Sequence, residues 1–239
     1  MSDGKSAFDN PMTLARLAGA AYLIIIAAGV WTEAVVRGGI RVRGDGAATA
    51  ANLIASEGLF RLGIAAEMVM ALADVTVAIL LFLLLRVVSK PLALAAAAFH
   101  LMSTAVLSAN MLTAFGALMF LSANMGGTFA PAAFEPEQAH ALIAFFFNLH
   151  GHGYSLALVF FSVNCLLLGC LIHRAKFLPS FLGWLMGAAG LVYLVTSFTR
   201  FLAPEHYGTL FYGFFICLIA ELALALWLVI RGVKPEAWG

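Results

Sequence analysis

The stretch RLGIAAEMVMALADVTVAILLFLLLR, from Arg61 to Arg86, decides the fold, because it is an apolar run between two arginines. The residues inside the arginines would form a helix of about 36 Å, which is long enough to cross a hydrocarbon core of about 30 Å. Two acids interrupt this run, Glu67 and Asp74, and their seven-residue spacing places them on one helical face. An ionisable side chain inside a membrane span is costly, so both acids mark a candidate functional site.

The composition of the whole chain indicates a membrane protein. Of the 239 residues, 63% are hydrophobic and 10% are charged, and the mean hydropathy is +1.00. Such a chain is far more apolar than a soluble domain, so the lipid bilayer is its expected environment. The net charge of +1, without a basic block containing aromatic residues, argues against nucleic acid as a partner. The three cysteines lie in apolar runs without a CxxC spacing, which predicts small buried side chains.

Six apolar runs predict an all-α membrane protein with six transmembrane helices in a single domain of residues 1–239. The predicted spans cover residues 15–36, 62–85, 91–121, 151–172, 181–202 and 208–230. Two short helices are also expected, at residues 47–57 after a capping Asp45 and at residues 136–149. We interpret them as outer-surface or re-entrant helices, and we expect Gly151 and Gly153 to bend the chain before the fourth span. Residues 1–11 and 124–135 read as loose or loop segments.

The distribution of lysine and arginine predicts the orientation of the chain. With the N-terminus inside, the cytoplasmic side would carry Lys5, Arg16, Arg86, Lys90, Arg174, Lys176, Arg231 and Lys234. The outer side would carry Arg37, Arg41, Arg43, Arg61 and Arg200. This excess predicts that both termini are cytoplasmic and that both short helices lie on the outer side.

Polar side chains within the predicted spans are the candidates for a binding site. Most of them fall in the outer half or the centre of the bilayer, whereas His100 alone falls toward the inner side. We therefore expect an outward-facing polar pocket that binds a small molecule or a cation. Glu33 either belongs to this pocket or forms an interfacial pair with Arg37, four residues further on. The candidate residues are Glu33, Glu67, Asp74, Asn110, His150, Arg200 and Glu221.

The four carboxylates among these candidates need compensation, because an unpaired charge inside a membrane costs several kcal/mol. They can take up protons, pair with Arg200 and the histidines, or bind a cation. Proton uptake by Asp74, Glu67 or Glu221 would allow proton-coupled transport or sensing, which is the leading hypothesis. The alternative of a structural protein without a ligand treats the polar residues as hydrogen-bonding contacts between helices.

An intramembrane metal-dependent hydrolase of lipid-like substrates is a further alternative. His150, Asp74 and Glu221 are the candidate ligands for zinc, manganese or iron, with Glu67 as the general base. The chain has no HExxH motif to support this. Haem is disfavoured, because its axial candidates His100 and His150 are predicted at opposite ends of the bilayer. The sequence leaves open whether the protein is an enzyme and whether it forms an oligomer.

Several short segments resemble an uncharacterised family of bacterial integral membrane proteins, classed as a domain of unknown function. The segments are RLAGAAYLI from Arg16, ASEGLFR from Ala55, Asp74, the His150 segment, CLLLG from Cys165, and Glu221-Leu222 with Leu226-Trp227. The resemblance covers nearly the whole chain, implies a bacterial cytoplasmic (inner) membrane, and draws attention to Asp74, His150 and Glu221. In that family an Asp is common at the position of Thr196 and a His at that of Asn164. The resemblance thus implies that two metal-ligand types are missing here.

Overall fold

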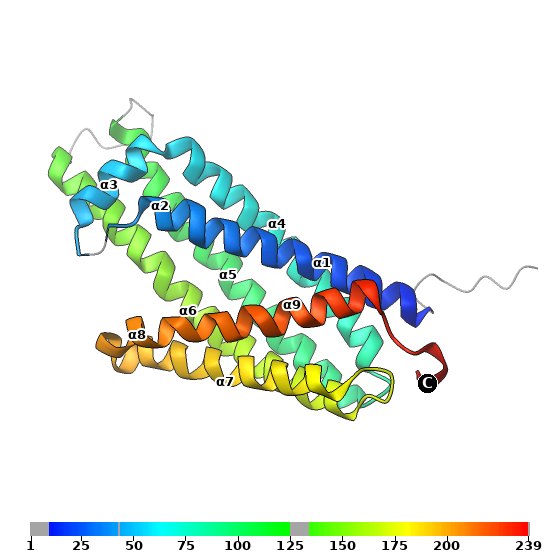
Figure 1. Cartoon of the computed structure of the whole chain (residues 1–239). Helices are drawn as coiled ribbons and strands as arrows, with labels where there is room; N and C mark the ends of the chain where they lie inside the picture. The colour runs from blue at the N-terminus through cyan, green and yellow to red at the C-terminus, as the bar shows by residue number, and fades with distance from the viewer. Residues whose placement is uncertain (1–9, 43, 125–133, 239) are drawn as a thin grey trace, which may run out of the picture. The chain divides into compact units, whose positions relative to one another are not determined.

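The computed structural model describes residues 10–42, 44–124 and 134–238, and all of the regular structure in this part of the chain is helical (Figure 1). This confirms the all-α prediction. Six helical stretches are long and apolar enough to cross a membrane, so the chain is a multi-pass membrane protein. They are Pro11–Ile40, Glu57–Leu85, Lys90–Phe120, Glu137–Arg174, Ser180–Leu202 and Pro204–Ile230.

The helices follow one another with short connections. The first stretch consists of α1 (Pro11–Trp31), the π-helix η2 (Thr32–Arg37) and α2 (Gly38–Ile40). It is followed by α3 (Gly46–Ala55), α4 (Glu57–Leu85), α5 (Lys90–Asn124), α6 (Pro136–Arg174) and α7 (Ser180–Leu202). The chain continues with α8 (Pro204–Leu210), the short η3 (Phe211–Gly213), α9 (Phe214–Ile230) and η4 (Pro235–Ala237).

Contacts divide the chain into two compact units. Unit 1 comprises Met1–Ile26, Ala71–Ala105 and Ser155–Gly239, and unit 2 comprises Ala27–Met70 and Val106–Tyr154. Four long helices are divided between the two units, namely α1, α4, α5 and α6. Helix α3 belongs to unit 2, and α7 to α9 belong to unit 1.

Unit 2 is built around an apolar core to which the short helix α3 contributes one face. As predicted, Asp45 caps this helix, and its side chain accepts a hydrogen bond from the Ala48 amide at 2.8 Å. Ala50 and Leu53 on α3 are fully buried, and they belong to one cluster with residues of η2, α2, α4, α5 and α6. The other fully or nearly fully buried members include Val36, Ile40, Ile64, Ala117 and Ile143.

Unit 1 is held together by close helix approaches at glycine. A Cβ atom on Gly183 of α7 would lie 2.7 Å from the backbone oxygen of Gly169 on α6, so no larger residue fits there without a shift. The same holds for Gly19 of α1, whose Cβ would lie 2.7 Å from the Ala225 oxygen on α9. In Figure 1, α7 and α9 run side by side within this unit. Small residues thus allow the close contact that packs helices in lipid.

The segment 136–149 does not form a separate surface helix, contrary to the sequence prediction. It is the first part of α6, which continues without a break from Pro136 to Arg174 through both glycines that were expected to bend it. Gly153 instead makes room for a side chain, because a Cβ atom there would lie 1.9 Å from Oδ1 of Asn110. A helix keeps its hydrogen bonds through glycine in an apolar setting, so close packing explains this residue better than a bend does.

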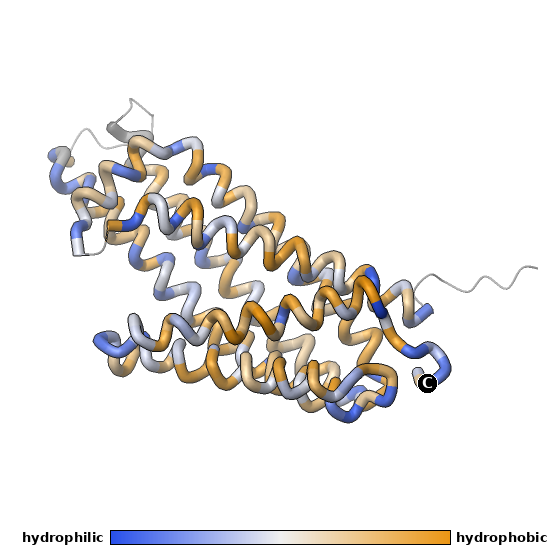
Figure 2. Tube along the Cα trace, viewed as in Figure 1, coloured by the Kyte–Doolittle hydropathy of each residue, from blue (hydrophilic) through white to orange (hydrophobic). Residues whose placement is uncertain are grey.

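Large apolar side chains cover much of the outside of the helices, as expected of a surface that faces lipid. Leu72, Leu112 and Leu202 are each at least 70% exposed within the protein. Figure 2 shows that hydrophobic residues dominate the long helices, while hydrophilic residues gather near the helix ends. The expected N-terminal segment before residue 10, most of the expected loop 124–135, and the charges of Lys5 and Arg43 lie outside the described residues.

Candidate functional site

The π-helix at the end of the first membrane stretch carries two charged residues of the site. In η2 the Gly38 amide reaches back to the oxygen of Glu33, which is the hydrogen-bond spacing of a π turn. The extra residue in this turn changes the direction of the side chains that follow it. Arg37 is 7% exposed, whereas the side chain of Glu33 is 47% exposed. Such π turns within α-helices often occur at functional sites.

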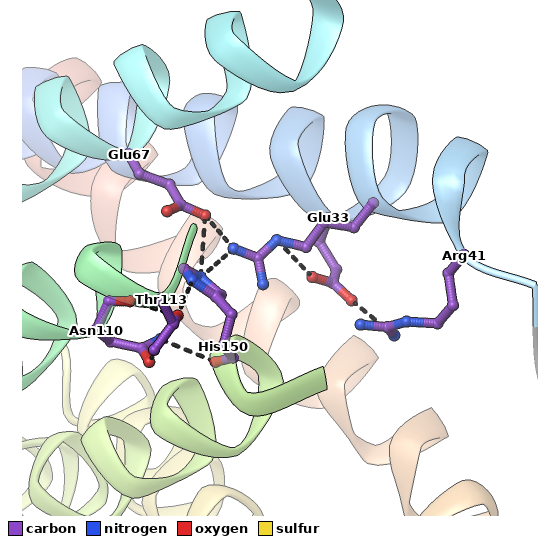
Figure 3. A network of polar contacts seen from close by, with 7 residues as sticks. Glu33, Arg41, Glu67, Asn110, Thr113 and His150 are labelled. Carbon is purple, nitrogen blue, oxygen red and sulfur yellow. Dashed lines mark hydrogen bonds and ion pairs between the residues drawn. The ribbon is translucent and has the colours of Figure 1, made fainter. Parts of the chain in front are cut away.

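The buried guanidinium of Arg37 pairs with the buried carboxylate of Glu67 on α4 (Figure 3). Its Nη2 atom contacts Glu67 Oε1 and also contacts Nε2 of His150 on α6. The same Glu67 oxygen lies 3.5 Å from His150 Nε2. One cation, one carboxylate and one imidazole therefore meet at a single point inside unit 2.

Two side chains of α5 fix the orientation of His150. Thr113 Oγ1 donates to the backbone oxygen of Asn110 at 2.6 Å and lies 3.1 Å from His150 Nδ1. Because the hydroxyl hydrogen is used in this way, the oxygen accepts from Nδ1–H, which leaves Nε2 as the acceptor for Arg37. Asn110 Nδ2 donates to the backbone oxygen of His150 at 2.8 Å and so joins α5 to α6. A proton added at Nε2 would therefore compete with Arg37 for this position.

A second, more exposed ion pair continues the network toward the end of α2. Glu33 lies 3.8 Å from Arg37 Nε and 3.8 Å from Arg41 Nη1, so it bridges the two arginines (Figure 3). The Arg41 guanidinium also lies over the ring of Phe147, 5.5 Å from its centre. With His150 neutral, two arginines balance two glutamates, and the network carries no net charge. We name this set of residues the unit 2 network: Glu33, Arg37, Arg41, Glu67, Asn110, Thr113 and His150.

The remaining predicted site residues belong to unit 1 and have partners of their own. Oδ1 of Asp74 lies 3.2 Å from Nε2 of His100, within hydrogen-bond distance. Glu221 accepts a hydrogen bond from the hydroxyl of Tyr193. Arg200 donates to the Tyr207 hydroxyl at 3.1 Å and lies 4.7 Å from the centre of that ring. The predicted pairing of Arg200 with a buried acid is therefore not found among the described residues, where Arg200 contacts Tyr207 instead.

A small cavity of about 10 Å³ lies beside His100 and Asn164 in unit 1. Asn164 is buried, and its Nδ2 has no hydrogen-bond partner among the described residues. The cavity is about the size that one water molecule needs. A water at this position could satisfy the amide of Asn164 close to the Asp74–His100 pair.

The residues suggested as metal ligands do not form a cluster in the described part of the chain. There, no group of three or more His, Cys, Asp or Glu side chains lies close enough together to hold a metal ion. Both ring nitrogens of His150 already contact Thr113 or Arg37, and Nε2 of His100 contacts Asp74. The described residues therefore contain no preformed set of three such side chains, and the hydrolase alternative stays a prediction.

Four members of the unit 2 network are among the site residues predicted from the sequence, namely Glu33, Glu67, Asn110 and His150. Arg37 is predicted at the membrane interface instead. The signal for Arg37 was its four-residue spacing from Glu33, and the structure contains that contact. Thr113 follows Asn110 by three residues on α5, and this spacing does not indicate its contact with His150. Pairing of the acids with histidines is among the predicted means of compensation, and Asp74 pairs with His100, but spacing within one helix does not show which histidine faces which acid.

Comparisons with known proteins give the family of this chain. Residues 17–232 match DUF4386, a domain of unknown function. An uncharacterised protein of Archaeoglobus fulgidus is 29% identical over 163 residues, which are 67% of this chain and 78% of that protein. No solved structure matches the chain significantly. Because the family match extends over nearly the whole chain, the protein belongs to the DUF4386 family.

Proposed function

We propose that the unit 2 network binds a small anionic ligand together with a proton, in transport or sensing across a bacterial cytoplasmic membrane. The observation that carries this proposal is the position of Glu67. Its Oε1 atom contacts Arg37 and lies 3.5 Å from His150 Nε2, so a single carboxylate oxygen faces both a fixed cation and a titratable ring. Proton binding at this point changes which partners Arg37 can hold.

A buried ion pair is not explained by stability alone. Removing two charges from water costs several kcal/mol per ion, and replacing a buried pair by apolar residues is often neutral or stabilising. The first and second membrane stretches consist mostly of apolar residues, so leucines at both positions would suit the bilayer at least as well. The presence of Arg37 and Glu67 therefore favours a functional role.

Charge balance indicates the kind of ligand. A proton taken up by Glu67 neutralises its carboxylate and removes the buried counter-ion of Arg37, which then keeps only the more exposed Glu33 at 3.8 Å. A guanidinium binds carboxylate and phosphate groups strongly through two parallel hydrogen bonds, so a ligand of this kind can replace Glu67. A cation, in contrast, would face both Arg37 and Arg41. The network thus favours uptake of an anion and a proton together, which leaves its net charge unchanged.

In this scheme His150 takes up the proton and passes it to Glu67. Its Nε2 lies close to the Glu67 oxygen, and Thr113 holds the opposite nitrogen of the ring. A proton on Nε2 would repel Arg37 and could pass to Glu67, because Nε2 lies 3.5 Å from the Glu67 oxygen. Transfer of the proton to Glu67 returns the ring to its neutral form and opens the ion pair. The orientation with both termini in the cytoplasm is part of the same proposal.

The test is anion binding at two pH values by the purified protein in detergent. Thermal shifts would be measured with acetate, glutamate and phosphate at about pH 5 and about pH 8, on either side of the histidine range. We expect wild type to be stabilised by at least one of these anions more strongly at the lower pH. Glu67→Gln, which imitates the protonated acid, should bind that anion equally well at both values.

The matched control is Glu57→Gln, which removes an acid of the same helix that pairs with Arg61 at the protein surface. This variant should keep the pH dependence of wild type. Anion binding that does not change between the two pH values in wild type would contradict the proton-linked proposal. Loss of thermal stability in Glu67→Gln, without any change in anion binding, would favour a purely structural role for the pair.

A further inference from the structure

A basic groove lies in unit 1 where the turn between α6 and α7 meets the segment after α9. It has a volume of about 400 Å³, within the range of about 300 to 1,000 Å³ that is typical of small-molecule sites. Three cations line it, namely Lys176, Arg231 and Lys234, and no acidic residue does. All three are exposed, and none forms an ion pair with a carboxylate in the described part of the chain.

The backbone on both sides of the groove is fixed by defined contacts. Helix α9 ends at Ile230, and two residues later Gly232, with a positive φ of 65° and an amide that donates to the Trp227 oxygen, reverses the chain direction. A Cβ atom on Gly232 would lie 2.1 Å from the sulfur of Met12, so glycine is also required by space. The Lys234 amide then donates to the Phe177 oxygen at 3.3 Å, which connects the two segments. These contacts therefore fix the backbone of the two segments that carry the three cations.

The groove combines these cations with apolar groups. Phe177 and Leu178 are buried in its wall, and Trp227 is half-buried and makes an edge contact with Phe181 at 5.8 Å between ring centres. Phe181, which contacts Trp227, and Ile230, which precedes Arg231, are also exposed apolar side chains. Tryptophan together with basic residues at the ends of membrane-spanning helices is typical of the boundary between lipid and water.

We infer that this groove binds the phosphate group of an anionic phospholipid. The phosphate fits between Lys176, Arg231 and Lys234, while the acyl chains can follow the apolar surface beside Trp227. A free phosphate ion would use the cations but would leave this apolar surface unused. The groove lies at the helix ends that are predicted to face the cytoplasm. Basic pockets on that side of a membrane bind anionic lipid headgroups. The ligand class does not depend on the proposed function of unit 2.

The test is native mass spectrometry of the detergent-purified protein with phosphatidylglycerol, phosphatidylcholine or inorganic phosphate. Wild type should bind phosphatidylglycerol more tightly than phosphatidylcholine. The triple variant Lys176→Gln/Arg231→Gln/Lys234→Gln should bind phosphatidylglycerol at least about tenfold more weakly, because three attractive charges are lost. The variant Lys176→Arg/Lys234→Arg keeps the charges and should bind like wild type.

The matched control is Arg16→Gln/Arg86→Gln/Lys90→Gln, which removes three exposed cations of unit 1 outside the groove. It should bind phosphatidylglycerol within about twofold of wild type. Equal binding of the two lipids by wild type, or an equal loss in the control, would overturn the proposal. Displacement of phosphatidylglycerol by inorganic phosphate at equal concentration would overturn the lipid as the source of the phosphate group.

Discussion

Unit 2 contains two Arg–Glu pairs that differ in their exposure to solvent. Arg37 and Glu67 are both buried, while Arg61 and Glu57 lie four residues apart on the surface of α4. An exposed pair of this kind contributes little, because water already solvates both charges. A buried pair is different, since the loss of either partner leaves a charge without compensation.

The first prediction compares the two arginines. Arg37→Gln should lower the free energy of unfolding by about 3 to 5 kcal/mol, because Glu67 is then buried without its cation. Arg61→Gln should change it by no more than about 1 kcal/mol. Denaturation in detergent, followed by circular dichroism, measures both values. Equal and small losses in the two variants would contradict the description of Arg37 as a buried, paired charge.

The second prediction concerns removal of both charges at once. Arg37→Leu/Glu67→Leu should fold with an unfolding free energy within about 1 kcal/mol of wild type, or above it, because no buried charge is left alone. The same variant should lose the pH-dependent binding of anions. A double variant as unstable as Arg37→Gln would show that the pair is required for folding and would favour the structural alternative.

At the scale of single residues, the sequence predicted that Glu67 is buried and that Glu33 lies near Arg37. It placed Arg37 at the interface because the predicted span ended at residue 36, whereas the helical stretch continues to Ile40. A π turn has no clear signature in apolar composition, so the burial of Arg37 could not be read from periodicity. Pairs such as Asp74 and His100 depend on how helices face one another, which one sequence does not contain.

At the scale of elements, the glycines of the spans have different roles that composition does not distinguish. Gly183 of α7 allows a close approach to α6, with Gly169 as its partner. The bend predicted at Gly151 and Gly153 is absent, and Gly153 instead accommodates the side chain of Asn110. In both cases the missing Cβ serves packing between helices, and only the partner helix shows which residue requires it.

The third prediction tests the contact between α5 and α6. Gly153→Ala should destabilise the protein by about 1 to 3 kcal/mol, because the added methyl group would overlap with the Asn110 amide. Gly58→Ala on α4 is the control, since nothing lies within 4 Å of its added Cβ, and it should be neutral or stabilising by up to about 1 kcal/mol. The combined change Gly153→Ala/Asn110→Ala should recover part of the loss. Melting temperatures in detergent decide between these outcomes.

The fourth prediction tests the π turn. Deletion of Ala34 would remove the extra residue from η2 and allow a regular α-helix, which would rotate Arg37 relative to Glu67. The deletion should therefore weaken stability about as much as Arg37→Gln, by about 3 to 5 kcal/mol. Wild-type stability after the deletion would show that the direction of Arg37 does not depend on this turn.

At the scale of the whole molecule, hydropathy was sufficient to predict six spans and an all-α fold, because long apolar runs have few alternatives in a bilayer. The sequence also predicted α3 and its Asp45 cap. It separated residues 136–149 from the fourth span, since polar residues and glycines interrupt the hydropathy there, although α6 is continuous. Orientation rests on the distribution of cations and stays a prediction.

The fifth prediction tests this orientation. In a variant without native cysteines, single cysteines would be introduced as Glu57→Cys, Glu205→Cys, Lys90→Cys and Lys234→Cys. A maleimide that does not cross the membrane should label the first two in intact bacterial cells, because those positions are predicted to face outward. The last two should react only after the cells are opened. The reverse pattern would show that the chain is inserted in the opposite orientation.

The most direct measurement of the central claim, that Glu67 exchanges a proton, is infrared difference spectroscopy across a pH titration. On acidification, wild type should gain a carboxylic acid C=O band that is missing in Glu67→Gln and retained in Glu57→Gln. This result would show that Glu67 takes up a proton in the folded protein and so loses its ion pair with Arg37. Identical spectra for wild type and Glu67→Gln over the whole range would contradict the proposed proton-linked binding site.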